Sequence, residues 1–161
     1  MVVGLELIRL DTYKGTEAIF YSVAIDGSDD TLFDEFLDKH INDYLEELRF
    51  IDNRIRTMNE ETGAREQFFK LNEGKLGDGV AAIYDLPSKR LRLYCIRFGS
   101  TTVILGGGGL KKTRTYQEDP ELKEQADMMI HLSKMISIAI KEKEIHLNPD
   151  GTFSGNLRLE E

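Results

Sequence analysis

The sequence predicts an α+β protein in which two helices of the N-terminal half and one long helix of the C-terminal half pack on an antiparallel sheet, with extra hairpins at both ends. Two observations support this fold class. Apolar residues recur at helical spacing in three stretches, and short apolar, β-branched runs separated by turn residues fill most of the rest. The 161 residues contain no linker, repeat or low-complexity segment, so we expect a single domain spanning 1–161.

The N-terminal elements follow from their local patterns. The apolar runs 2–10 and 18–25, separated by the turn residues 11–15, predict a hairpin of two strands. Ser28, Asp29 and Asp30 are N-cap and first-turn residues for a helix that begins near Thr31. A second helical pattern covers 41–58 and ends where Gly63 can serve as the C-cap.

Three strand candidates follow in close order at 80–86, 90–98 and 101–105. The turns between them, at 87–88 and 99–100, are short enough for an antiparallel meander. Residues of the middle strand alternate between its two faces, and we expect the face with the charges to be exposed and Cys95 to lie in the core on the other. The exposed set is Arg90, Arg92, Tyr94, Ile96 and Phe98.

The C-terminal part predicts a long helix from about 118 to 143, with acidic residues and Pro120 in its first turn. A hairpin that turns at Asp150-Gly151 follows. The run Gly106–Gly109 precedes this helix and invites comparison with a phosphate-binding P-loop. The second glycine of that motif would fall on Lys111, so we interpret the run as a turn or bulge that lets backbone come close to another group.

The distribution of charge matters more than its total. The chain has 21 Lys and Arg against 29 Asp and Glu, a formal charge of −8, which alone argues against a polyanionic partner such as RNA. Residues 86–116, however, hold seven basic and no acidic side chains, and the remaining 130 residues sum to −15. Two interpretations stay open: a basic working surface on an acidic body, or solvated lysines and arginines that lack acidic neighbours.

Other features of the composition predict the cellular location, the absence of a membrane partner and the absence of a metal site. Cys95 is the single cysteine, so no internal disulfide forms, which indicates a reducing, cytoplasmic location. No apolar run approaches the roughly 20 residues of a membrane helix, and the N-terminus lacks the pattern of a signal peptide, so no membrane partner is expected. His40, His131 and His146 have no metal-ligand spacing, and we expect no metal site.

A series of motifs runs through the middle of the chain in a fixed order. A glycine-containing loop after Phe69 leads into a strand, and the next strand carries Arg92 between apolar residues. An apolar strand, the element Lys111-Lys112-Thr113, and a helix start with Pro120, Glu121 and Ala126 come next. This order covers about 60 of the 161 residues and resembles the RelE/HigB-like toxins, small bacterial mRNA endonucleases with a RelE-like α+β domain.

The resemblance implies the toxin component of a toxin–antitoxin system. Such an endoribonuclease cleaves mRNA, in association with the ribosome, by attack of the 2′-hydroxyl, and it needs no metal or organic cofactor. Its partner is a cognate antitoxin, often a small DNA-binding protein of the helix-turn-helix type. The oligomeric state does not follow from the sequence.

The chemistry assigns roles to residues of the basic segment. Cleavage needs a base, a group that stabilises charge on the phosphate, and an acid for the leaving oxygen. Arg92 is the candidate for the phosphate, with Lys112 and Tyr94 as further catalytic candidates. Contacts to the RNA backbone or bases are expected from a second group, which comprises Arg90, Lys111, Arg114 and Tyr116.

Three alternatives remain at this stage. Tyr94 can be a half-buried sheet aromatic and Arg92 a solvated charge without catalytic role. The chain can be a non-catalytic RelE-like module that binds a protein or nucleic acid. An unrelated α+β enzyme acting on a small anionic substrate would use the same arginine and lysine cluster, but in a deep pocket.

Overall fold

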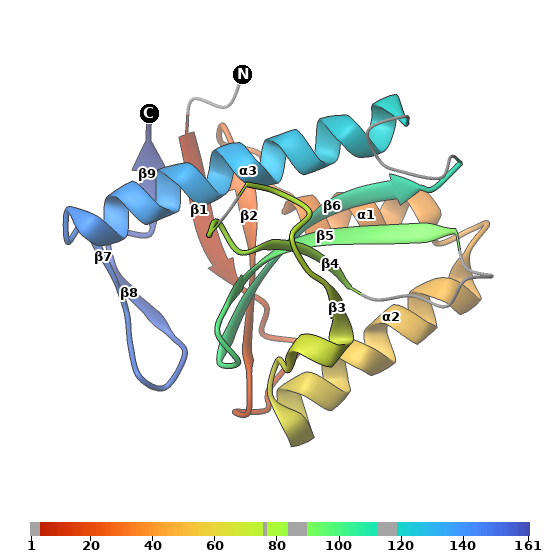
Figure 1. Ribbon diagram of the computed structural model, residues 1–161, viewed down its shortest axis with the longest axis horizontal. Helices are drawn as coiled ribbons and strands as arrows, with labels where there is room; N and C mark the ends of the chain where they lie inside the picture. The colour runs from red at the N-terminus through yellow and green to blue at the C-terminus, as the bar shows by residue number, and fades with distance from the viewer. Residues whose placement is uncertain (1–3, 76, 84–89, 113–118) are drawn as a thin grey trace.

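The computed structural model describes residues 4–75, 77–83, 90–112 and 119–161, and a seven-stranded sheet lies at its centre (Figure 1). The order of strands in the sheet is β3-β4-β5-β6-β2-β1-β9. The pair β2–β6 is parallel and the other neighbours are antiparallel, so the predicted α+β class is confirmed. The strands are β1 (Gly4–Arg9), β2 (Ile19–Ile25), β3 (Phe69–Lys70), β4 (Val80–Ile83), β5 (Leu91–Phe98), β6 (Thr102–Leu110) and β9 (Arg158–Glu160).

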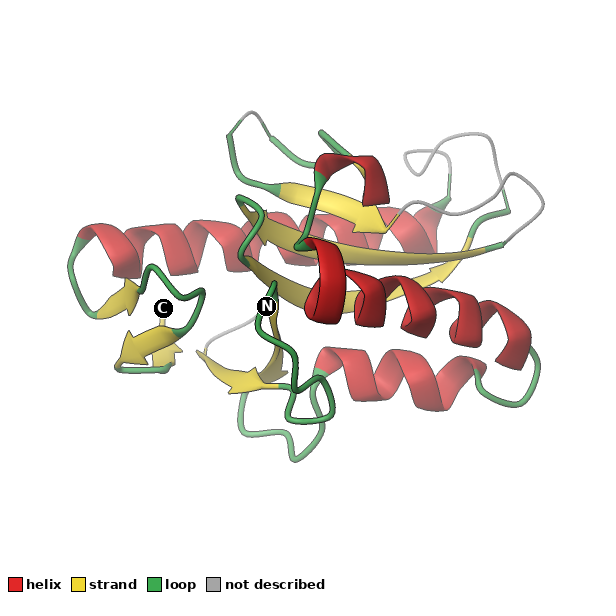
Figure 2. Ribbon diagram, turned by 90° about the horizontal axis from the view of Figure 1, so that it is seen from below, coloured by secondary structure: helices red, strands yellow, loops and turns green. Residues whose placement is uncertain are grey.

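Helices cover both faces of this sheet. The long helix α3 (Pro120–Lys141) crosses one face, and α1 (Leu32–His40) and α2 (Leu45–Thr57) lie on the other (Figures 1 and 2). Alternate strand residues accordingly feed two cores: Tyr94 and Ile96 pack in the cluster under α3, whereas Leu93 and Cys95 pack in the cluster under α1 and α2. Within the part of the chain described, no helix combines the length and apolar character that crossing a bilayer requires.

Both predicted hairpins are present. Strands β1 and β2 pair antiparallel, with Leu5 opposite Ile25, and this hairpin extends the main sheet because β2 lies beside β6. The C-terminal hairpin, β7 (Ile145–Leu147) with β8 (Phe153–Gly155), forms a separate two-stranded sheet that turns at Asp150-Gly151. After it, β9 returns to pair with β1.

Helix ends follow their capping residues. The N-cap of α1 is Thr31, one residue beyond the predicted Ser28–Asp30, because its side chain and that of Asp34 form a reciprocal capping box. After α2 the chain makes a π-helical turn, η1 (Met58–Thr62), and Gly63 ends it with a φ of 79°, as predicted. A short 3₁₀ turn, η2 (Glu66–Phe68), then leads into β3. Pro120 occupies the first turn of α3 after the N-cap Asp119.

The glycine run is part of a strand. We predicted that the strand ends at Leu105, but β6 continues through Gly106–Gly109 to Leu110. The pairing with β5 shifts between Leu93 and Cys95, so that Gly106 and Gly107 lie opposite Tyr94. The bulge interpretation is therefore right and the turn interpretation wrong. A Cβ atom on Gly106 would overlap Met129 of α3, so the run lets that helix approach the sheet closely.

Candidate functional site

Three of the predicted cations meet at one end of the sheet. Arg90 directly precedes β5 and Lys111 directly follows β6, and the amide of Lys111 donates to the carbonyl oxygen of Arg90 over 2.7 Å. Lys112 comes next, its amide bound to the Asp119 carboxylate at 3.0 Å. The side chains of Arg90 and Lys112 are exposed and that of Lys111 is half-buried. Arg114 and Tyr116, also predicted to bind RNA, lie outside the described residues.

Acidic groups of the helices reach the same end of the sheet. Oε1 of Glu47 accepts hydrogen bonds from the amides of Arg90 (2.6 Å) and Leu91 (3.1 Å), which fastens α2 to the start of β5. Lys39 of α1 forms an ion pair with Glu121 of α3 at 3.1 Å. Glu47 and Glu121 at this end of the sheet already have partners, whereas the exposed Asp43 and Glu46 line a pocket together with Arg90.

Arg92 is buried, not exposed as predicted. Its side chain is 5% exposed, and Nη1 donates to Oε1 of Glu73 at 3.1 Å, itself on a side chain 7% exposed. Lys70 lies 4.0 Å from the same carboxylate oxygen. The prediction failed because α3 covers this face of the sheet and the loop after β3 brings Glu73 over it. The charge that we expected to face solvent is instead neutralised inside the fold.

Tyr94 is also inside the protein. It is fully buried in the cluster under α3 and lies opposite the bulge in β6. The alternation predicted for β5 is correct, but the predicted exposure of this face is wrong, because the long helix supplies a second layer over it. Contact between Tyr94 and an RNA base would therefore need a rearrangement of α3.

Glu73 is the residue that the sequence analysis missed. It lies in the loop between β3 and β4, and its amide donates to the Val80 carbonyl oxygen at 3.1 Å, which holds the loop against the sheet. The same loop is tied to α3, since Oγ of Ser133 donates to the carbonyl oxygen of Asp78 at 2.6 Å. Sequence spacing contains no signal for a pairing across 19 residues between a loop carboxylate and a strand guanidinium.

The cysteine and the histidines are poorly placed to act as a nucleophile or as metal ligands. Cys95 lies in the core, as predicted, and burial raises the pKa of its thiol, which disfavours the thiolate needed for a nucleophile. His131 lies 3.2 Å from Glu161, and His146 is exposed. Among the described residues, no group of three histidine, cysteine, aspartate or glutamate side chains is placed to hold a metal ion.

His40 gives a testable pH effect. It is 4% exposed in the last turn of α1, between the rings of Phe36 and Tyr44 at 5.1 and 6.1 Å, and its Nε2 has no hydrogen-bond partner among the described residues. Burial, and then Lys39, lower its pKa, although Glu121, Asp43 and Glu47 oppose this shift. In the unfolded chain His40 therefore takes up a proton near pH 6.5, whereas in the folded protein it becomes protonated only at a lower pH.

The free energy of unfolding should consequently decrease as the pH falls below about 6.5. Urea unfolding at about pH 7.5 and about pH 5.5 measures this decrease. In His40→Leu the decrease should shrink, whereas in His146→Gln, which changes an exposed histidine, it should stay as in the unmodified protein. An unchanged pH dependence in His40→Leu would contradict the assignment.

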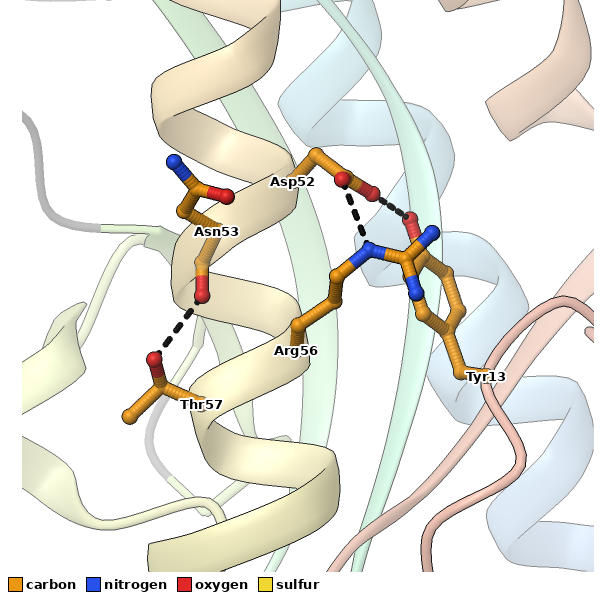
Figure 3. Close-up of polar contacts among 5 residues, drawn as sticks. All are labelled: Tyr13, Asp52, Asn53, Arg56 and Thr57. Carbon is orange, nitrogen blue, oxygen red and sulfur yellow. Dashed lines mark hydrogen bonds and ion pairs between the residues drawn. The ribbon is translucent and has the colours of Figure 1, made fainter.

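A second polar cluster joins the loop after β1 to α2 (Figure 3). The hydroxyl of the buried Tyr13 donates to one oxygen of Asp52 at 2.7 Å, and Nε of Arg56 donates to the other at 2.9 Å. The Arg56 guanidinium also lies 5.2 Å from the centre of the Tyr13 ring. Burial, followed by the bond to Asp52, raises the pKa of Tyr13, so the phenol stays protonated and serves to fasten the loop.

Comparison of the chain with protein-family models, with curated proteins and with solved structures gave no match.

Proposed function

We propose that the chain is a RelE/HigB-like toxin component, an endoribonuclease that cleaves ribosome-associated mRNA and is held inactive by a helix-turn-helix antitoxin. The observation that carries the proposal is the convergence of Arg90, Lys111 and Lys112 at one end of the sheet. These cations come from the acid-free segment 86–116, whose seven basic residues suit the phosphates of a nucleic-acid backbone.

The proposed reaction begins with phosphate binding by Arg92. A guanidinium binds phosphate oxygens in a bidentate manner, so a scissile phosphate can replace Glu73 on Arg92 once α3 or the loop after β3 moves to open this buried pair. The displaced carboxylate then accepts the proton of the 2′-hydroxyl, whose oxygen attacks phosphorus. The bond from phosphorus to the 5′-oxygen breaks, and Lys112 donates the proton that the leaving oxygen requires. This proposal gives the buried Tyr94, next to Arg92 on the same face of β5, a supporting role and no contact with substrate.

RNA binding is the first test. In anisotropy titrations of a labelled single-stranded RNA, Arg90→Ala and Lys112→Ala should each weaken binding about threefold. Each should also reduce the slope of log K against log salt by about 0.7, the value for one phosphate contact on a single strand. Both side chains are exposed, so neither substitution should affect folding.

Lys141→Ala is the matched control, because this exposed lysine lies in the last turn of α3, at the end far from Lys112 (Figure 1). It should retain the affinity and the salt slope of the unmodified protein. Equal losses in all three variants would indicate diffuse electrostatic attraction and contradict a backbone site at this end of the sheet.

A second candidate is a non-catalytic RelE-like module that binds RNA or a protein. The ion pair and burial of Arg92 favour it, since the guanidinium is already occupied. Cleavage of mRNA with and without ribosomes distinguishes the candidates. Arg92→Lys is the informative variant, because lysine keeps the charge beside Glu73 but loses the planar fork. The nuclease proposal requires that the unmodified protein cleaves mRNA and that Arg92→Lys, at equal stability, does not. RNA binding by the unmodified protein without any cleavage would instead establish the non-catalytic binding module.

A further inference from the structure

A pocket of about 360 Å³ lies where α3 passes beside the strand β9. In Figure 1 the last turns of α3 extend past β9 on the side away from β1, and β9 forms one edge of the described sheet. The pocket is lined by Lys134 and Ile138 of α3, by Glu142 at its C-cap, and by Leu159 and Glu160 of β9. The helix therefore overhangs a sheet edge that no other described strand covers.

The part of α3 that lines this pocket has opposite charges on the two sides of an exposed apolar residue. Ile138 is 47% exposed, and Lys134 and Glu142 lie four residues before and after it, on the same face of the helix. Neither charged side chain forms an ion pair with another described residue. An antiparallel copy of this helix, centred on the same isoleucine, would place each Lys134 opposite the other copy's Glu142.

The edge strand has a similar pattern about Leu159. The exposed Arg158 and Glu160 flank it on either side. The amide of Leu7 donates to the Leu157 carbonyl oxygen at 2.8 Å, so Leu157 and Leu159 direct their backbone groups towards β1. The carbonyl oxygen of Arg158 and the amide of Glu160 consequently point away from β1, towards the uncovered side of the edge.

A second copy of β9, antiparallel to the first and with Leu159 opposite Leu159, would meet these backbone groups in reciprocal positions. Each Glu160 amide would donate to the Arg158 carbonyl oxygen of the other copy. The Arg158 amide already donates to Oδ1 of Asn156 at 3.2 Å and is not needed for these two bonds.

The side chains of β9 favour the same register. With Leu159 at the centre, each Arg158 lies opposite the other copy's Glu160, a cross-strand pair of opposite charge, whereas centring on Arg158 or Glu160 would oppose like charges. Arg158 also pairs with Glu6 at 3.1 Å, but that contact uses Nη2, and the guanidinium has two further nitrogens.

The remaining charges of the pocket do not by themselves select this partner. Glu144 and Glu161 also line it, and Glu161 lies 3.2 Å from His131. Carboxylates alone would suit a basic segment of another protein equally well. A second copy is favoured because α3 and β9 each carry opposite charges at equal spacing about one apolar residue, and a twofold axis satisfies both patterns at once.

From the overhanging helix, the uncovered strand edge and the two symmetric charge patterns, we infer that this surface binds a second copy of the chain about a twofold axis, joining the two sheets edge to edge through β9. The surface contains none of the residues proposed to bind or cleave RNA. The inference therefore stands or falls separately from the proposed nuclease activity.

Sedimentation equilibrium of the full chain over about 1–300 µM tests the inference, and a reversible monomer–dimer equilibrium is expected. Lys134→Glu would oppose two glutamates at both ends of the helix contact and should weaken the dimer about tenfold or more. Glu142→Lys should do the same by opposing two lysines. The combined variant Lys134→Glu/Glu142→Lys restores opposite charges, so its affinity should return to within about threefold of the unmodified protein. Glu160→Arg should also weaken the dimer, by opposing Arg158 of the other copy.

Two matched controls separate this contact from general effects of charge. Lys123→Glu makes the same change of charge as Lys134→Glu on an exposed lysine of α3 outside the pocket, and should leave the dimer unchanged. Ile138→Asp would place two carboxylates at the axis and should abolish the dimer, whereas Ile41→Asp, at an equally exposed isoleucine after α1, should not.

Four outcomes would overturn the inference. The first is a chain that stays monomeric over the whole concentration range. The second is a dimer that Ile138→Asp does not weaken. Equal losses in Lys123→Glu and Lys134→Glu would indicate diffuse repulsion, and a combined variant as weak as the two single variants would exclude the opposed charge pairs.

Discussion

Gly108→Ala is expected to destabilise the protein by about 3 kcal/mol or more, the largest effect of any single methyl group in the glycine run. A Cβ atom at this position would overlap the carbonyl oxygen of Arg92 on the neighbouring strand, and backbone atoms of a central strand cannot move aside without breaking the ladder. Because Arg92 also carries the ion pair with Glu73, the displacement would disturb that pair as well.

The other glycines provide a graded comparison. At Gly106 the added methyl meets Met129, a flexible side chain in a fully buried site, and a cost of about 1–2 kcal/mol is expected. At Gly107 it meets only the end of Gln125, which is half-buried and can turn away, so the cost should be smallest. Gly4→Ala, where the nearest atom is 3.4 Å away, serves as the control outside the run.

Urea denaturation followed by circular dichroism measures this series. The expected order of free energies of unfolding is Gly4→Ala and Gly107→Ala highest, then Gly106→Ala, then Gly108→Ala. If Gly108→Ala were as stable as Gly107→Ala, β5 and β6 would not be in the close contact described, and the bulge would need to be placed elsewhere.

Glu73→Leu is the second large prediction, with an expected loss of about 3–5 kcal/mol. The substitution removes the carboxylate and leaves the Arg92 guanidinium, on a side chain 5% exposed, without a counter-charge in the interior. Arg92→Leu should cost less, because Glu73 keeps Lys70 as a cationic partner at 4.0 Å. In the double variant both charges are gone, and a large part of the stability should return.

A double-mutant cycle in urea isolates the interaction between the two side chains. Lys123→Ala is the control, since it breaks an exposed ion pair with Asp127, 2.7 Å long, that should be worth less than about 1 kcal/mol. Single-variant losses near that of Lys123→Ala would show that Arg92 and Glu73 reach solvent. That result would restore the exposed arginine predicted from the sequence and remove the need for a phosphate to displace Glu73.

The structure also changes how the catalytic proposal must be tested. Arg92→Ala would disturb the fold by leaving Glu73 without this ion pair, so an absence of cleavage in that variant would not test phosphate binding by Arg92. Arg92→Lys retains a positive partner for Glu73 and changes only the geometry of the donor groups. Lys112 and Arg90, being exposed, can be replaced without this complication.

Helices, strands and turns were predicted correctly where their formation depends on neighbouring residues in the sequence. Four predicted features depend on residues close in the chain: the hairpin β1–β2, the amphipathic helices, the meander from β4 to β6, and the turn at Asp150-Gly151. The position of Cys95 was correct because strand alternation places successive side chains on opposite faces. The strand end at Leu105 was wrong because glycine has low strand propensity, yet here the close approach of α3 requires it.

The amino-acid sequence by itself determined the α+β class, the two hairpins and the segregation of seven cations into residues 86–116. Only the tertiary structure decided that α3 covers the face carrying Arg92 and Tyr94, that Glu73 neutralises Arg92, and that the last turns of α3 extend past the edge strand β9. The physical reason is that periodicity tells which side chains share a face. Whether that face meets water or another layer depends on contacts between segments far apart in the chain.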